Sequence, residues 1–134
     1  MFANVMGTAM NFAFPDCCYT PIAGVPTPLP YPSISETAVA TPAAYTVLLD
    51  CLPTVTQTSF DLVSEGDETG VNLGIVSFME SGLTEYLLGN VTIMAYGTPV
   101  QRLTSITGQN CLGVLLNTAG VTLSPSQVTV LTLG

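Results

Sequence analysis

The side chains that could bind a metal or carry covalent chemistry are four cysteines and nine acidic residues, in a chain of 134 residues without histidine. Neither a Ser-His nor a Cys-His nucleophile pair can therefore form, and imidazole is excluded as a metal ligand or general base. Thiolates remain as ligands that could hold zinc. The thiolate candidates are Cys17, Cys18, Cys51 and Cys111.

The spacing of the cysteines leaves three states open. Four thiolates can hold zinc, but zinc sites usually pair ligands roughly two to four residues apart, whereas Cys17 and Cys18 are adjacent. Disulfides are the second state, and they are rare in cytosolic chains. Reduced cysteines that are buried as small apolar side chains are the third state. This third state is the expectation, so neither a metal site nor a cofactor is predicted.

Four acidic residues, Asp61, Glu65, Asp67 and Glu68, lie in or beside residues 64–70, whose Ser, Gly and Asp content is typical of a loop. Paired carboxylates can perform acid–base catalysis, as in glycosidases, and they can bind calcium. The spacing does not fit an EF-hand loop, which needs oxygen ligands at alternate positions and a closing Glu. We expect a solvated turn and no enzyme, with an acidic hydrolase that uses Asp61 and Asp67 as a minor alternative.

The charge balance restricts the partners. The chain has one basic residue, Arg102, and a net charge of −8, with 7% charged and 48% hydrophobic residues. Binding to nucleic acid or to anionic lipid needs clustered Lys or Arg, so both are excluded. Disordered chains combine high charge with low hydrophobicity, so disorder is excluded as well. Residues 103–134 carry no charge, which predicts a surface that a partner protein covers.

Short stretches rich in β-branched residues predict an all-β fold with internal repetition. Residues 46–48, 92–94 and 129–131 read Thr-Val-Leu, Thr-Ile-Met and Thr-Val-Leu. Pro53 and Pro99 follow the first two copies at the same offset of 46 residues. The first two copies are 46 residues apart and the last two are 37 apart, so any threefold repetition is approximate. Strands are predicted at residues 45–52, 59–63, 71–79, 84–88, 91–96 and 128–133.

Residues 1–45 contain most of the prolines, densely in residues 25–32. Proline fixes φ and lacks an N–H, so this part is predicted as an extended arm. Residues 46–134 would supply the repeated strands of one domain that spans 1–134. The N-terminus lacks the positive charge of a secretory signal, and no apolar run reaches the ~18 residues of a membrane helix. A cytoplasmic origin is therefore expected.

Five motifs along the chain resemble a known family. Residues 11–21, with Phe-Pro-Asp-Cys-Cys-Tyr-Thr-Pro at their end, and residues 28–34, Pro-Leu-Pro-Tyr-Pro-Ser-Ile, resemble the opening of PAAR-like proteins. These are tip proteins of type VI secretion spikes, in the branch first catalogued as a domain of unknown function. Cys18 takes the family cysteine position, and Ser33 replaces the usual Asn. The other three similar motifs are residues 66–71, 102–110 and 123–131.

The resemblance implies a compact, cone-shaped β-fold of short strands with approximate pseudo-threefold repetition. Its base would sit on a trimeric VgrG-like spike protein, with one tip per trimer, and it would help to load an effector or adaptor. The protein would be cytoplasmic before firing, and would then be exported with the spike after transient contact with a target membrane. Because the chain ends after the last predicted strand, no effector extension is predicted.

Two alternatives accompany the resemblance. PAAR proteins proper hold zinc with His and Cys ligands, and this chain has no His. Packing and hydrogen bonds are expected to replace the metal, while a thiolate-only site of Cys18 with the other cysteines stays an alternative. The tip of a phage tail, a pyocin or an extracellular contractile injection particle is the alternative to a type VI spike tip.

Overall fold

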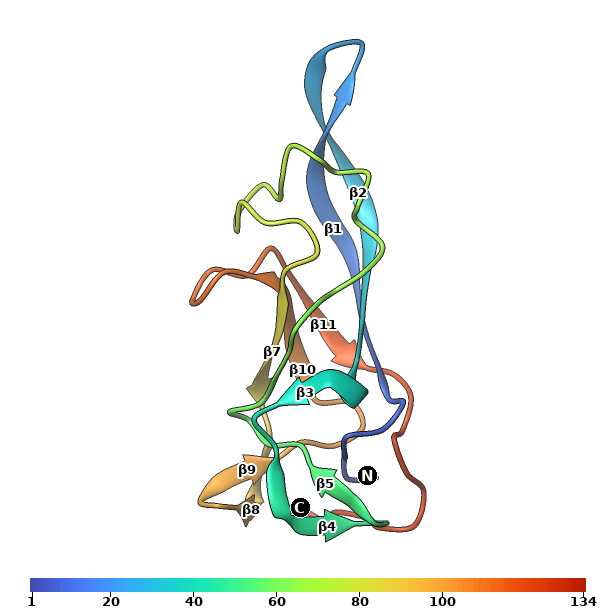
Figure 1. Cartoon of the computed structure of the whole chain (residues 1–134), viewed down its shortest axis with the longest axis vertical. Coiled ribbons are helices and arrows are strands. Elements are labelled where there is room, and N and C mark those ends of the chain that lie inside the picture. The colour runs from blue at the N-terminus through green and yellow to red at the C-terminus, as the bar shows by residue number, and fades with distance from the viewer.

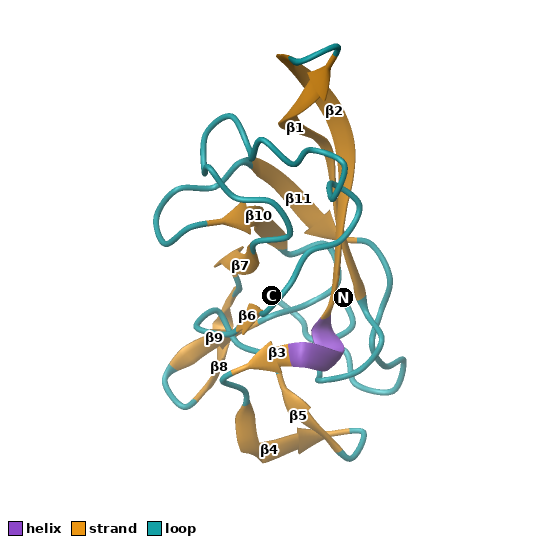
Figure 2. Cartoon of the chain, turned by 45° about the horizontal axis from the view of Figure 1, so that its top comes forward, coloured by secondary structure: helices purple, strands orange, loops and turns teal.

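The computed structural model describes residues 1–134 and has an elongated all-β shape that tapers toward one end (Figure 1). The all-β prediction is confirmed, since the one helical element is the 3-10 turn η1 (Thr37–Val39) and no helix could span a membrane (Figure 2). The strands are β1 (Met10–Ile22), β2 (Val25–Glu36), β3 (Ala40–Thr41), β4 (Ala44–Leu49), β5 (Leu52–Thr54), β6 (Phe60–Asp61), β7 (Leu83–Leu88), β8 (Asn90–Ala95), β9 (Thr98–Val100), β10 (Ile106–Cys111) and β11 (Thr118–Thr122).

The main sheet has seven strands in the order β2-β1-β11-β10-β7-β6-β3. β1 and β2 form a long hairpin that makes the narrow end of the molecule (Figure 1). Its two turn residues, Ala23 and Gly24, have φ values of 51° and 83°. A two-residue turn with positive φ at both positions matches the right-handed twist of paired strands, so the turn stabilises this hairpin.

The proline-rich residues 25–32 form part of strand β2, whereas the sequence predicted an extended arm. Pro26, Pro28 and Pro30 occupy alternate positions of β2. Val25 flanks the two-residue turn and therefore exchanges hydrogen bonds with its partner in β1. Such positions alternate along the strand, so the three prolines lie at the positions in between, where a backbone N–H would point away from β1. The prolines therefore remove no backbone hydrogen bond between β2 and β1. Because β2 is an edge strand, they also leave its outer edge without donors at positions 26, 28 and 30, which disfavours aggregation through that part of the edge.

Two small hairpins, β4–β5 and β8–β9, lie at the broad end (Figure 1). Leu48 pairs with Pro53, and Met94 pairs with Pro99. Every pair of the second hairpin lies 46 residues after a pair of the first, and both hairpins have the same irregularity after their first pair. The Thr-led repeat in the sequence therefore corresponds to two hairpins with the same register.

The predicted strand at residues 128–133 does not form a regular strand. Its backbone meets the N-terminus instead: the Thr132 N–H donates to the Met1 carbonyl oxygen at 2.7 Å, and the Met1 amino group donates to the Thr132 carbonyl oxygen at 3.0 Å. The Val130 N–H is bonded by the side-chain Oε1 of Gln127 at 2.7 Å. The Gln127 side chain thus accepts a hydrogen bond from a backbone N–H that would otherwise bond a neighbouring strand, which prevents a continuous strand here.

Three segments close a ring of backbone hydrogen bonds above the small hairpins. The Asn4 N–H donates to the Gln101 carbonyl oxygen (2.8 Å), the Gln101 N–H to that of Val55 (2.9 Å), and the Val55 N–H to that of Asn4 (3.0 Å). A second set of backbone hydrogen bonds joins the same three segments in the opposite order. Its N–H donors are Met6, Gln57 and Leu103, and the carbonyl oxygens that accept from them are those of Pro53, Pro99 and Phe2, respectively. Pseudo-threefold repetition of the whole fold stays a prediction. We call residues 2–6, 53–57 and 99–103 the base ring.

The interior is unusually polar, because buried polar residues outnumber buried hydrophobic ones. The two apolar clusters are small: one centres on Ala3, Ala44, Ala95 and Val100, and the other contains Tyr86. Buried polar groups stabilise a fold only when they are hydrogen-bonded. Much of the specificity of this fold therefore depends on side-chain hydrogen bonds.

Replacement of Gly120 by alanine is expected to lower the free energy of unfolding by about 3 kcal/mol. Gly120 in β11 pairs with both Ala13 and Thr107. A Cβ there would lie 2.8 Å from the Ala13 Cβ and closer still to the Phe12 carbonyl oxygen. Urea unfolding would measure the loss. Gly24→Ala is the matched control, because open space but a φ of 83° at Gly24 predicts a loss of only about 1 kcal/mol. A larger loss in the control would contradict the steric argument.

Candidate functional site

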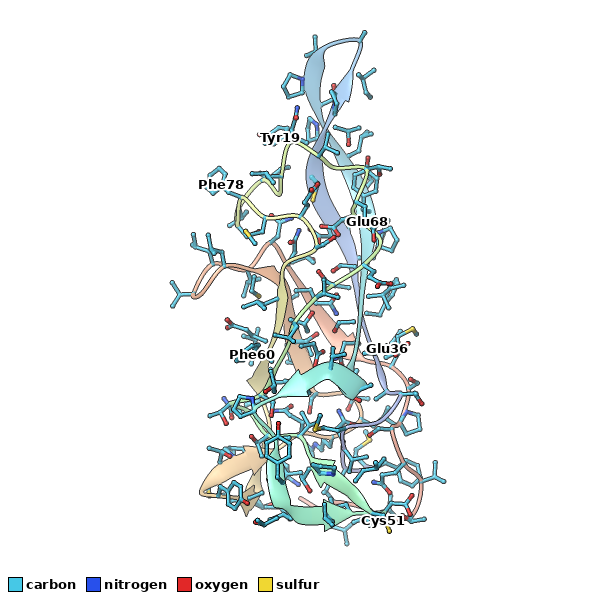
Figure 3. All side chains as sticks on the ribbon, viewed as in Figure 1. Tyr19, Glu36, Cys51, Phe60, Glu68 and Phe78 are labelled. Atoms are coloured by element: carbon cyan, nitrogen blue, oxygen red, sulfur yellow. The ribbon has the colours of Figure 1, made fainter.

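Two regions combine residues from distant parts of the chain, and the first is a buried polar centre between the β1–β2 hairpin and the loop that follows β6. Asp16 and Cys18 come from β1, and Asp67 comes from the loop between β6 and β7. All three residues are completely buried, and one ligand atom of each lies within 4.8 Å of the other two. In Figure 3, Tyr19 and Glu68, the chain neighbours of Cys18 and Asp67, both lie in the upper half of the molecule. We call Asp16, Cys18 and Asp67 the neck centre.

Asn110, near the end of β10, forms a hydrogen bond with Asp67, the residue of the neck centre that comes from the loop. Its Nδ2 donates to Asp67 Oδ2 at 2.7 Å and to the Met79 carbonyl oxygen at 2.8 Å. Its Oδ1 accepts from the Gly82 N–H at 3.0 Å. This backbone donor determines the orientation of the amide, so its nitrogen faces Asp67. Asn110 has a φ of 54°, a conformation that asparagine tolerates better than most residues.

Asn117, between β10 and β11, forms hydrogen bonds with Asp16 and its neighbour in β1. Its Nδ2 donates to Asp16 Oδ1 and, at 2.9 Å, to the Cys17 carbonyl oxygen. Its Oδ1 accepts from the Val76 N–H at 2.9 Å. The strand predicted at residues 71–79 is wrong: these residues form turns, and side-chain acceptors such as Asn117 bond their backbone in place of a neighbouring strand.

The neck centre has no positively charged side chain near it. The one basic side chain, Arg102, donates to the Gly134 carbonyl oxygen at the broad end. Burial, and then the charges of Asp16 and Asp67, raise the pKa of the Cys18 thiol to about 12. Burial also raises the pKa of both carboxyl groups. A positive species, a proton or a metal ion, is therefore needed to balance these groups.

The prediction of a solvated acidic turn is wrong for two of its four residues. Glu65 and Glu68 are exposed, but Asp61 and Asp67 are completely buried. Asp61 Oδ2 accepts from Asn11 Nδ2 at 2.8 Å and from Ser35 Oγ at 2.7 Å. Burial raises the pKa of Asp61 to about 6. The loop composition indicated that these side chains are exposed to solvent, whereas hydrogen-bond donors from β1 and β2 make burial of Asp61 favourable.

The structure does not bring the four cysteines together, so the thiolate-only site is not assembled. Only Cys18 joins the neck centre. Cys17 is half-buried, Cys51 is exposed in the β4–β5 turn, and Cys111 is buried at the end of β10. All four are free thiols, without a disulfide. Sequence reasoning singled out Cys18 but missed its partners, although Asp16, Asp67 and Asn110 lie in the same motifs that carried the family resemblance.

The second region is the apolar outer surface of the broad end. Leu48, Met94 and Leu131 occupy equivalent positions in the three Thr-led segments, and they are 56%, 59% and 57% exposed. β4 and β8 lie at this end together with both chain termini, and Cys51 marks its rim (Figures 1 and 3). A large exposed apolar surface is typical of an interaction site. We use the name base surface for the exposed large apolar residues of these three segments, which besides Leu48, Met94 and Leu131 are Tyr45, Val91, Ile93, Tyr96, Val128 and Leu133.

These features define an all-β domain that tapers from an apolar base to a β-hairpin. A family model of the Toxin PAAR-like domain (Tox-PAAR-like) matches residues 9–115, and the chain belongs to this family. The predicted family is confirmed, and membership supports a structural spike-tip or toxin-associated role. Comparisons with curated proteins and with solved structures found no match.

Proposed function

We propose that this domain caps a trimeric VgrG-type spike protein of a type VI secretion system, with one copy per trimer. The base surface would contact the spike, and the β1–β2 hairpin would point outward. The observation that carries this proposal is the base ring, in which three segments of one chain exchange backbone hydrogen bonds cyclically. A single chain with such an arrangement can present similar contacts to three identical subunits.

The side chains around the base ring support this binding mode. Leu48, Met94 and Leu131 have nearly equal exposure and lie on three chain segments that are related by the Thr-led repeat. Burial of apolar surface is the dominant favourable contribution to most protein association, so these side chains can stabilise a complex. The low charge of this part of the chain also fits an interface, since interface cores are depleted of charged residues.

The same geometry suits envelope puncture and effector delivery. The narrow end is a two-stranded hairpin in which Pro26, Pro28 and Pro30 remove N–H donors from the outer edge of β2, so this edge resists pairing with other strands. In this proposal the domain waits in the cytoplasm, binds an effector or adaptor, and leaves with the spike when the sheath contracts. A phage-tail, pyocin or extracellular injection particle would use the same contacts. A hydrolase is disfavoured, because Asp61 and Asp67 are completely buried.

Mixing the chain with candidate VgrG-type trimers tests the proposal. Size-exclusion chromatography with light scattering is expected to give a complex of one copy with three spike subunits. The cyclic arrangement of the base predicts this ratio, since one copy occupies the whole threefold end. Three copies per trimer, or no complex with the spike protein encoded beside this chain, would contradict it.

A further inference from the structure

The charge of the neck centre needs a balancing cation. Asp16, Cys18 and Asp67 are completely buried and lie close together. The chain has no Lys or His, and its one Arg lies at the opposite end. Burial of carboxylates without a paired cation is strongly unfavourable. Either protons or a bound metal ion must therefore occupy this centre.

The hydrogen bonds leave one ligand atom available. Asp16 Oδ1 accepts from Asn117, but Asp16 Oδ2 is buried and accepts no hydrogen bond. A buried carboxylate oxygen without a partner is costly, and coordination to a cation would remove the cost. The orphaned atom is thus a second sign, separate from the clustering, that a ligand belongs here.

The distance between two of the candidate ligands fits one metal ion. The Cys18 thiol donates a hydrogen bond to Asp67 Oδ2, and the two atoms are 3.7 Å apart. Tetrahedral zinc with a sulfur at about 2.3 Å and an oxygen at about 2.0 Å separates these atoms by about 3.5 Å. A metal ion that replaces the thiol proton between these two atoms would therefore need little change in their separation.

We propose that Asp16, Cys18 and Asp67 bind one divalent metal ion, with zinc as the preferred ion. A thiolate with two carboxylates suits zinc, whereas calcium and magnesium prefer oxygen ligands alone. Binding would release the thiol proton of Cys18 to solvent. Asn110 and Asn117 would orient the two carboxylates as hydrogen-bond donors, a role that outer partners of metal ligands commonly have. This proposal is independent of the proposed function.

Such an ion would join β1 to the loop between β6 and β7. That loop has no strand between residues 62 and 82, so the metal would fix it against the hairpin. Zinc would then stabilise the folded state, because the site is absent from the unfolded chain.

The test uses the whole chain, stripped of metal with a chelator and then titrated with Zn²⁺ or Co²⁺. We expect about one equivalent bound per chain, a thiolate-to-cobalt charge-transfer band, and a rise in Tm of roughly 5 °C or more with excess zinc. Cys51→Ser is the matched control, since Cys51 is exposed and outside the centre, and it should bind as the parent does. Cys18→Ser and Asp16→Asn should lose the cobalt band and the Tm shift.

Several outcomes would overturn the proposal. A folded parent chain that takes up no zinc and shows no Tm shift would show that protons balance the centre. Unchanged cobalt binding in Cys18→Ser would place the ion elsewhere. If Cys18→Ser does not fold, Asp16→Asn decides, because it keeps the size of the side chain. Higher stability of Asp16→Asn in the absence of metal, without any response of the parent to zinc, would also favour protons.

Discussion

A variant in which Leu48, Met94 and Leu131 are all replaced by aspartate is expected to bind the trimeric spike at least ~100-fold more weakly than the parent. The three side chains are more than half exposed, so the isolated domain should keep its fold and its circular dichroism spectrum. In the complex, each new carboxylate would be buried against apolar surface without a partner, which costs several kcal/mol. Calorimetric titration of the spike with the parent and with the variant measures the loss.

The single variants test the threefold binding mode more sharply. Leu48→Asp, Met94→Asp and Leu131→Asp should each weaken binding by a similar factor, because the three side chains would meet equivalent subunits. The matched controls are Phe78→Asp and Val114→Asp, each of which places the same single charge on an exposed apolar position of a loop outside the base surface. Equal loss in these controls, or loss confined to one of the three base positions, would contradict the proposal.

Asp61 is expected to make the domain less stable as the pH rises from 4 to 7. Burial raises its pKa from 3.8 to about 6, so between these values the folded state holds a proton that the unfolded state has lost. The stabilisation is fully present below pH 3.8, is lost as the pH rises through 6, and amounts to about 3 kcal/mol. Urea unfolding at intervals between pH 4 and pH 7 measures it.

Asp61→Asn isolates this contribution, because burial also raises the pKa of Asp16 and Asp67. An amide oxygen at position 61 can still accept from Asn11 and Ser35, which bond the present carboxylate. The variant should therefore gain up to about 3 kcal/mol relative to the parent at pH 7 and little at pH 4. Parallel pH profiles for the two proteins would contradict the assignment to Asp61.

Local sequence patterns predicted the first strand of each small hairpin, β4 and β8, but neither β5 nor β9, and they missed most of the main sheet. β8 follows directly from the Thr-led repeat, because β-branched residues favour strands locally. Its turn is formed by Tyr96 and Gly97, whereas Pro99 lies in β9. β10 was missed because its residues, Ile-Thr-Gly-Gln-Asn-Cys, lack apolar alternation. Both of its faces are largely buried among polar partners. β1 was missed because proline and cysteine content suggested an arm, although its pairing with β2 and β11 makes it central to the sheet.

The sequence by itself determined the all-β class, the family, and the absence of histidine-based and polycationic chemistry, because composition and local propensity decide these. Only the tertiary structure decided which polar residues are buried and adjacent. Asp16 and Asp67 are 51 residues apart in the chain, and they meet because Asn110 and Asn117 supply donors from other elements. Burial of a carboxylate is favourable only where such distant donors or a cation meet it, so no local pattern could predict the neck centre.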